Sequence, residues 1–195
     1  MPKVIALTGG IGSGKTFVSS IFNKLNKVPC FYSDFEAKKI MNENQLIKKQ
    51  IISILGPESY IGDKLNNEYL RKKIFYSQNK LNMMNKLVHN QVKINFRKWL
   101  SNQNSKYVLK ETAILFEHNF QYEVDLTLLV TAPLKVRIER IIKRDNISKK
   151  TIEKIIENQW ADNKKIHLSD FFIENLNKSN TIKKVKNLVD IFSNL

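Results

Sequence analysis

The chain has 195 residues, which is enough for one domain with a buried core and short for several. Lys and Arg number 33 against 18 Asp and Glu, a formal net charge of +15, yet 42% of the residues are hydrophobic, which excludes a disordered basic tail. No apolar run reaches the ~20 residues of a membrane-spanning helix, and the single cysteine, Cys30, excludes an internal disulfide. We therefore expect a cytoplasmic protein that does not enter a membrane. The basic charge favours anionic partners, and phosphate-bearing small molecules satisfy it as well as nucleic acid does.

Strand patterns and helix patterns alternate along the chain. Short apolar runs predict five strands, at residues 3–8, 29–32, 106–115, 124–132 and 170–174. Helical spacing of apolar residues predicts helices over residues 15–25, most of 35–100, 134–144, 145–165 and 181–194. This alternation predicts an α/β fold with a parallel five-stranded sheet flanked by helices. We divide the single domain into a core (1–34, 105–145 and 166–195), a helical insertion (about 35–104) and a helical lid (about 146–165).

A glycine-rich sequence follows the first predicted strand. It reads GGIGSGKT and fits the phosphate-binding pattern GxxxxGK[ST], in its required place between a strand and a helix. Glycines let the backbone wrap around a phosphate with its N–H groups pointing inward, and the helix N-terminus adds a positive dipole end. Lys15 would bridge the β- and γ-phosphates, and the Thr16 hydroxyl would hold Mg²⁺. The predicted ATP-binding residues of this loop are Gly9, Gly10, Ile11, Gly12, Ser13, Gly14, Lys15 and Thr16.

Asp34 follows the second predicted strand, which we expect to lie next to the strand of the phosphate-binding loop. Open α/β sheets bind ligands at the carboxyl ends of their strands, so this carboxylate is placed to accept the proton of an attacking hydroxyl or to help hold a metal. The spacing fits equally well an N-cap for the helix from Phe35 onward. Glu111 and Glu117 flank the end of a later strand, where an acid can aid the binding of a metal or a substrate hydroxyl.

Three of the five arginines, Arg137, Arg140 and Arg144, fall at i, i+3 and i+7 of one predicted helix. Arginine suits bidentate phosphate contacts, while a solvated helix face explains such a trio equally well. The charged segment that follows is a candidate lid that closes over nucleotide and excludes water. The three histidines have no metal-ligand spacing, and Cys30 fits a small core residue better than a nucleophile.

The chain closely resembles the dephospho-CoA kinases, P-loop kinases of the nucleoside-monophosphate-kinase-like group, almost from end to end. IALTGGIGSGKT resembles the start of that family and is more specific than a bare P-loop. Asp34 falls on the last acid of the family's DAD segment, which reads YSD here, and His89 falls on its HP dipeptide. The stretch AILFE, which ends at Glu117, is similar to the family's PLLFE. Further matches are Arg140, Arg144 and Asp145 on RxxxRD, Gln159 on a late lid glutamine, and SDFFIEN, which ends at Asn175, on ADxVIxN.

The resemblance implies a P-loop NTPase fold with a helical substrate-binding insertion, and ATP-dependent phosphorylation of the ribose 3′-hydroxyl of dephospho-CoA, the last step of coenzyme A biosynthesis. ATP is then the co-substrate and Mg²⁺ the cofactor. We expect a monomer or a weak homo-oligomer, with no nucleic-acid partner and no membrane. The implied catalytic residues are Asp34 as the base, Lys15 and Arg140; Arg144 binds ATP; Asp34, His89 and Glu117 bind substrate; and Thr16 is the metal ligand.

Other functions stay open at this point. Another small-molecule kinase, or a nucleoside or nucleotide kinase, shares the P-loop, although the TGGIG prefix and RxxxRD speak against it. A regulatory GTPase needs an NKxD-type guanine motif, which the sequence lacks. A nucleic-acid-binding ATPase is suggested by the charge of +15, but the lysines are spread along the chain and do not form a dense cluster with interleaved aromatic residues.

Overall fold

The computed structural model describes residues 1–75, 77–145 and 147–195. Tyr76 in the predicted insertion and Asn146, the first residue of the predicted lid, lie outside the described residues. The chain forms two compact units, one of residues 1–32 and 102–195 and one of residues 33–101. The roles predicted for these parts of the chain, a substrate-binding insertion and a lid that closes over nucleotide, stay predictions.

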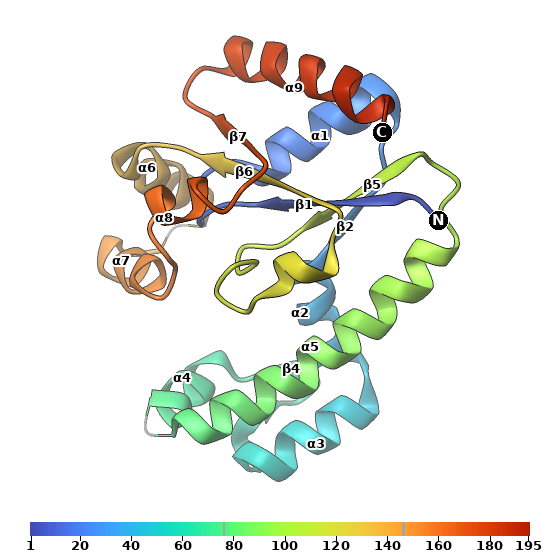
Figure 1. Cartoon of the computed structure of the whole chain (residues 1–195). Coiled ribbons are helices and arrows are strands. Elements are labelled where there is room, and N and C mark those ends of the chain that lie inside the picture. The colour runs from blue at the N-terminus through green and yellow to red at the C-terminus, as the bar shows by residue number, and fades with distance from the viewer. Residues whose placement is uncertain (76, 146) are drawn as a thin grey trace. The chain divides into compact units, whose positions relative to one another are not determined.

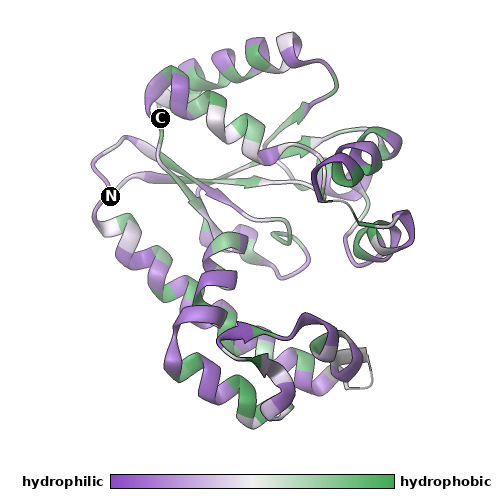
Figure 2. Ribbon diagram, turned by 180° about the vertical axis from the view of Figure 1, so that it is seen from behind, coloured by the Kyte–Doolittle hydropathy of each residue, from purple (hydrophilic) through white to green (hydrophobic). Residues whose placement is uncertain are grey.

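The first unit is built on a five-stranded sheet in which every pairing is parallel and the strand order is β2-β5-β1-β6-β7 (Figure 1). This confirms the predicted α/β fold. Strands β1 and β6 are nearly continuous apolar runs because both faces of the sheet are covered, and Figure 2 shows hydrophobic residues along them. The strands are β1 (Lys3–Thr8), β2 (Cys30–Tyr32), β5 (Tyr107–Glu111), β6 (Leu126–Thr131) and β7 (Phe171–Glu174).

Two helices, α1 (Lys15–Asn26) and α9 (Lys178–Ser193), pack against each other on one face of this sheet. Their apolar stripes meet the strands in the main core, where the Phe22 and Phe192 rings stack with centroids 5.9 Å apart. The remaining helices of the unit are η2 (Phe120–Glu123), α6 (Leu134–Asp145), α7 (Lys149–Glu157) and α8 (Asp162–Ile166).

The opposite face of the sheet is covered by a turn that the sequence pattern assigns to a strand. The strand predicted over 106–115 ends at Glu111, and the apolar residues after it leave the ladder. Leu115 and Phe116 instead pack against Ala6 as a second buried cluster, with Trp160 at its edge. An apolar run predicts burial, but it does not distinguish a continued strand from a turn packed on the sheet face.

The place of β2 in the sheet differs from the prediction. We expected β2 next to the P-loop strand β1, but β2 pairs with β5, and β5 pairs with β1. The carboxyl end that adjoins the P-loop on this side therefore belongs to β5 and carries Glu111. Strand order follows from the long-range pairing of segments, which the local pattern of β2 does not encode.

The second unit is mostly helical, as predicted, with the turn at Gly56-Pro57. Asn44 caps α3 by accepting hydrogen bonds from the N–H groups of Leu46 and Ile47. The sequence pattern misses a small antiparallel hairpin, whose strands have two residues each. The elements are α2 (Ser33–Glu43), α3 (Gln45–Leu55), η1 (Pro57–Ser59), β3 (Tyr60–Ile61), β4 (Lys64–Leu65), α4 (Asn67–Phe75) and α5 (Gln78–Ser101).

Over the three described stretches of the chain, no helix has both the length and the apolar character needed to cross a membrane.

Candidate active site around the P-loop

The glycine-rich loop lies between the carboxyl end of β1 and the first turn of α1. Gly14, which precedes α1, has φ 97°, and a Cβ there would overlap the side-chain amide of Asn175, so the position needs glycine for conformation and for space. Lys15 is 8% exposed, and its ammonium donates to the Gly9 carbonyl over 2.9 Å. Within the loop, the Ser13 N–H donates to the Gly10 carbonyl. The loop is thus a folded turn that holds a buried cation.

Two oxygen-bearing side chains meet at the start of α1. The Thr16 hydroxyl donates to Oε2 of Glu111 over 3.4 Å. Glu111 ends β5 beside β1, so a carboxylate stands at the edge of the sheet where ligands bind. A hydroxyl and a carboxylate are hard oxygen ligands of the kind that Mg²⁺ prefers, and Mg²⁺ is commonly held by one or two protein groups together with phosphates. These residues fit the predicted metal, with Glu111 added to Thr16.

Arg140 lies against the loop, and its predicted catalytic role stays a prediction. One terminal nitrogen of its guanidinium donates to the carbonyls of Ser13 (3.3 Å) and Gly12 (3.5 Å), and the other donates to the carbonyl of Asn175 (2.8 Å). The planar fork thereby spans the P-loop and the end of β7 at once, a geometry that a lysine ammonium cannot reproduce.

Arg137, on the same helix, is buried and holds the tip of the loop. Its Nε donates to the Ile11 carbonyl over 2.9 Å, and its guanidinium pairs with Asp162 at 3.3 Å. From the other side, the side-chain oxygen of Gln159 accepts the Ile11 N–H over 3.0 Å. The solvated-face explanation is therefore wrong for Arg137, because its side chain is only 6% exposed and is bonded to the loop and to Asp162.

Among the described residues, no hydrogen bond or ion pair joins Arg144, the third of the trio, to the loop. It forms two hydrogen bonds of 2.7 Å with the carboxylate of the neighbouring Asp145, and its side chain is 63% exposed. These hydrogen bonds raise the pKa of the Arg144 guanidinium. The predicted contact of Arg144 with ATP stays a prediction, and it requires the guanidinium to exchange Asp145 for phosphate.

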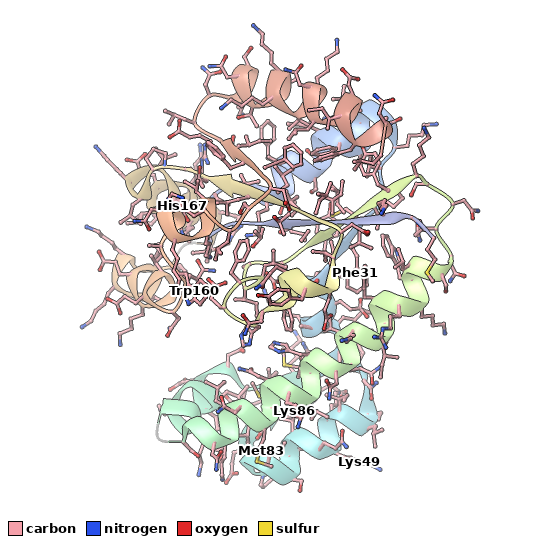
Figure 3. All side chains as sticks on the ribbon, in the orientation of Figure 1. Phe31, Lys49, Met83, Lys86, Trp160 and His167 are labelled. Carbon is pink, nitrogen blue, oxygen red and sulfur yellow. The ribbon has the colours of Figure 1, made fainter. Side chains whose placement is uncertain are left out.

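Glu117 is held in a buried ion pair. Its Oε1 lies 2.6 Å from the ammonium of Lys165, which is fully buried in α8, and it also accepts the backbone N–H of Trp160 over 2.9 Å. Trp160 and His167, both labelled in Figure 3, precede and follow Lys165 in the sequence. The pair ties the turn after β5 to the segment after α7. The substrate-binding role predicted for Glu117 stays a prediction beside this structural one.

Asp34 and His89 belong to the second unit. The helix α2 begins at Ser33, so Asp34 lies inside its first turn and the N-cap explanation is wrong. A carboxylate there still interacts favourably with the positive end of the helix dipole. His89 lies on α5, and its role as a substrate-binding residue stays a prediction, as does the role of Asp34 as the base.

The same unit carries an open cleft of about 500 Å³ between α3 and α5. Met83 and Lys86, labelled in Figure 3, line it together with Gln50, Ser53, Ile54, Leu87 and Asn90. None of the predicted site residues belongs to this lining.

The sequence pattern gave no role at the loop to Arg137, Gln159 or Asn175. The sequence singles out Gln159 and Asn175 only by their resemblance to the family, and Arg137 only as one of three arginines on a predicted helix. One signal was available: arginine is rare in this lysine-rich chain, and both Arg137 and Arg140 use the several donors that distinguish arginine from lysine. A single polar residue such as Gln159 offers no comparable local signal.

Comparison with known proteins supports the resemblance. The family model for dephospho-CoA kinase matches residues 3–181. A dephospho-CoA kinase of Bacteroides fragilis is 36% identical over 186 residues (95% of this chain, 90% of that protein), and one of Buchnera aphidicola is 31% identical over 195 residues (100% and 91%). A solved protein of Thermus thermophilus superposes with a TM-score of 0.87 at 25% identity, covering 97% of both chains. The dephospho-CoA kinase from Campylobacter jejuni, at 21% identity, superposes with a TM-score of 0.70 over 100% of this chain and 98% of that chain, and shows the same fold. With a P-loop matched in sequence and in place, this chain belongs to the dephospho-CoA kinase family.

Proposed function

We propose that this protein transfers the γ-phosphoryl group of ATP to the ribose 3′-hydroxyl of dephospho-CoA, which gives CoA and ADP. The observation that carries the proposal is the family match over residues 3–181 of a chain whose P-loop is folded around a buried lysine. A P-loop alone supports phosphate binding, and the family match supports the choice of acceptor.

The P-loop residues bind and orient ATP. Backbone N–H groups of the loop and the N-terminus of α1 supply donors and a positive dipole end for the β- and γ-phosphates. Lys15, already inside the loop, exchanges the Gly9 carbonyl for phosphate oxygens. Arg140, next to the loop, neutralises charge that develops on the transferred phosphoryl group.

Asp34 acts as the base in this scheme. It is the second residue of α2, directly after β2, and it accepts or orients the proton of the attacking ribose hydroxyl. Thr16 and Glu111 would hold Mg²⁺, with Arg144 as a further ATP contact and His89 and Glu117 on the acceptor side. When bound, Mg²⁺ neutralises phosphate charge and aligns the leaving group.

The test is a coupled ADP-release assay with Mg²⁺ and ATP, in which dephospho-CoA is compared with adenosine, AMP and no acceptor. We expect ADP release only with dephospho-CoA, and CoA as the product. Activity with another acceptor alone would contradict dephospho-CoA as the substrate but not phosphoryl transfer from ATP at the P-loop. ATP hydrolysis that needs added RNA or DNA would favour the nucleic-acid-binding ATPase.

A matched pair of variants on one helix tests the role of the loop. Lys15→Ala removes the buried ammonium and should lower kcat by on the order of 100- to 1,000-fold, the usual effect of losing one donor to transition-state charge. Lys24→Ala, in the last turn of the same helix, should keep wild-type turnover. Equal turnover of the two variants would contradict the assignment of Lys15. A cytoplasmic location and the monomer or weak homo-oligomer stay predictions of the proposal.

A further inference from the structure

The direction of one P-loop carbonyl is set by a side chain from the far end of the sheet. The Ser13 carbonyl accepts a hydrogen bond of 2.8 Å from the side-chain amide of Asn175, which follows β7. A peptide unit is planar and trans, so its C=O and N–H point in opposite directions. A Ser13 carbonyl held toward Asn175 therefore turns the Gly14 N–H away from it. We propose that Asn175 is a positioning residue for nucleotide binding, because it fixes the Ser13–Gly14 peptide in the orientation that presents the Gly14 N–H to phosphate.

The Asn175 side chain is itself held in one orientation. The residue is 3% exposed, and the Thr181 hydroxyl, which is fully buried, approaches its Oδ1 at 3.1 Å. A carbonyl oxygen such as that of Ser13 only accepts hydrogen bonds, so the NH₂ end of the amide has to face it. The backbone of Asn175 is fixed as well, since its N–H donates a hydrogen bond of 2.8 Å to the backbone carbonyl of Thr131. The donor thus reaches the loop with little freedom to rotate.

The loop is shaped to receive this donor. A Cβ on Gly14 would overlap Nδ2 of Asn175, so glycine at this position lets the amide come against the backbone. The only other donor that the structure gives to the Ser13 carbonyl among the described residues is Arg140, at 3.3 Å. In the proposed mechanism Arg140 turns toward the transferred phosphoryl group. Asn175 then keeps the Ser13 carbonyl in place, so the peptide does not rotate when Arg140 leaves it.

The inference rests on the proposed function only in that the P-loop binds ATP, and ADP binding tests it without dephospho-CoA. Asn175→Leu keeps the size of the side chain and removes the donor, while Asn175→Ala removes both. One N–H bond to a charged phosphate corresponds to about 10- to 100-fold in affinity, so we expect ADP to bind that much more weakly to both variants by titration calorimetry. KM for ATP should rise while KM for dephospho-CoA stays the same.

Asp170→Ala is the matched control. Asp170 precedes β7 at its other end, where its carboxylate accepts hydrogen bonds of 2.7 Å from the N–H and the hydroxyl of Thr127. Its loss should lower Tm as the Asn175 variants do, with ADP affinity unchanged. ADP affinity is compared at a temperature below the Tm of every variant, and if one Asn175 variant does not fold, the other carries the test.

Wild-type ADP affinity in a folded Asn175 variant would overturn the inference, and so would an equal loss of affinity in Asp170→Ala. A wild-type protein that binds ADP but does not convert dephospho-CoA would overturn the proposed function instead. The two failures are therefore distinguishable.

Discussion

The ion pair between Lys165 and Glu117 should dominate the stability of the segment after α7. At 2.6 Å and an effective dielectric constant of about 20, the attraction is about 6 kcal/mol, and desolvation of the two groups offsets much of it. Lys165→Met leaves the largely buried Glu117 carboxylate without its cation, and breaking a buried pair in this way costs about 3–5 kcal/mol. This loss is a large fraction of the free energy of unfolding of a domain, which is roughly 5–15 kcal/mol.

The free energy of unfolding, from urea denaturation followed by circular dichroism, measures the effect. Lys164→Met is the control, because the Lys164 ammonium is exposed and lies over the Trp160 ring at 3.4 Å from its centroid, a contact of about 1 kcal/mol at most. Adding Glu117→Gln to Lys165→Met should recover most of the loss, since a neutral amide oxygen still accepts the Trp160 N–H. Equal losses in Lys165→Met and Lys164→Met, with unchanged m-values, would refute this reasoning.

Three further predictions concern the site and its surroundings. Asp34→Asn should lower kcat by about 100- to 10,000-fold, the usual contribution of a general base, with Tm nearly unchanged, and wild-type turnover would remove Asp34 as the base. Arg140→Lys should lower kcat/KM at least about 10-fold, because one ammonium does not reach the carbonyls of both Ser13 and Asn175; steady-state kinetics with an unchanged kcat/KM would exclude Arg140 from the site. Burial, aided by the charge of Glu111, raises the pKa of the Cys30 thiol to about 12. The unfolded chain loses this proton first, so the free energy of unfolding should fall by up to about 1.4 kcal/mol per pH unit between pH ~9 and about 12. A Cys30→Ala variant with the same alkaline decline would contradict this cause.

The strands and the P-loop could be predicted because their signals are local. The apolar run of β1 and the GGIGSGKT that follows specify strand, phosphate loop and helix within a short stretch of chain. The neighbours of β2 could not be predicted, since the same short apolar run is compatible with several places in a parallel sheet.

The residues that hold the loop were missed for a related reason. Gln159 lies 148 residues from its partner Ile11 along the chain, and Asn175 lies 162 residues from Ser13. The local sequence around each residue does not predict such a contact, because the contact forms only when the segment after α7 and the carboxyl end of β7 come against the P-loop in the folded chain. The N-cap explanation of Asp34 failed on a smaller scale, because the first residue of a helix is uncertain by one or two positions in a sequence pattern.

The contacts after α7 hold the second half of the predicted lid in place and leave α7 as the part that can move. Gln159 is bonded to the loop tip, and Lys165 is locked to Glu117, so moving residues 159–166 would cost the several kcal/mol of a buried ion pair. The helix α7 packs on α6 and buries Ile152, and the burial of such a side chain contributes about 1.5–3 kcal/mol, which moving α7 would have to overcome. Any swing of the lid should therefore pivot near Asn158, where α7 ends. Nucleotide can then enter and leave by moving only α7, while the hydrogen bonds from the Ile11 N–H to Gln159 and from Asn175 to the Ser13 carbonyl stay in place throughout the cycle.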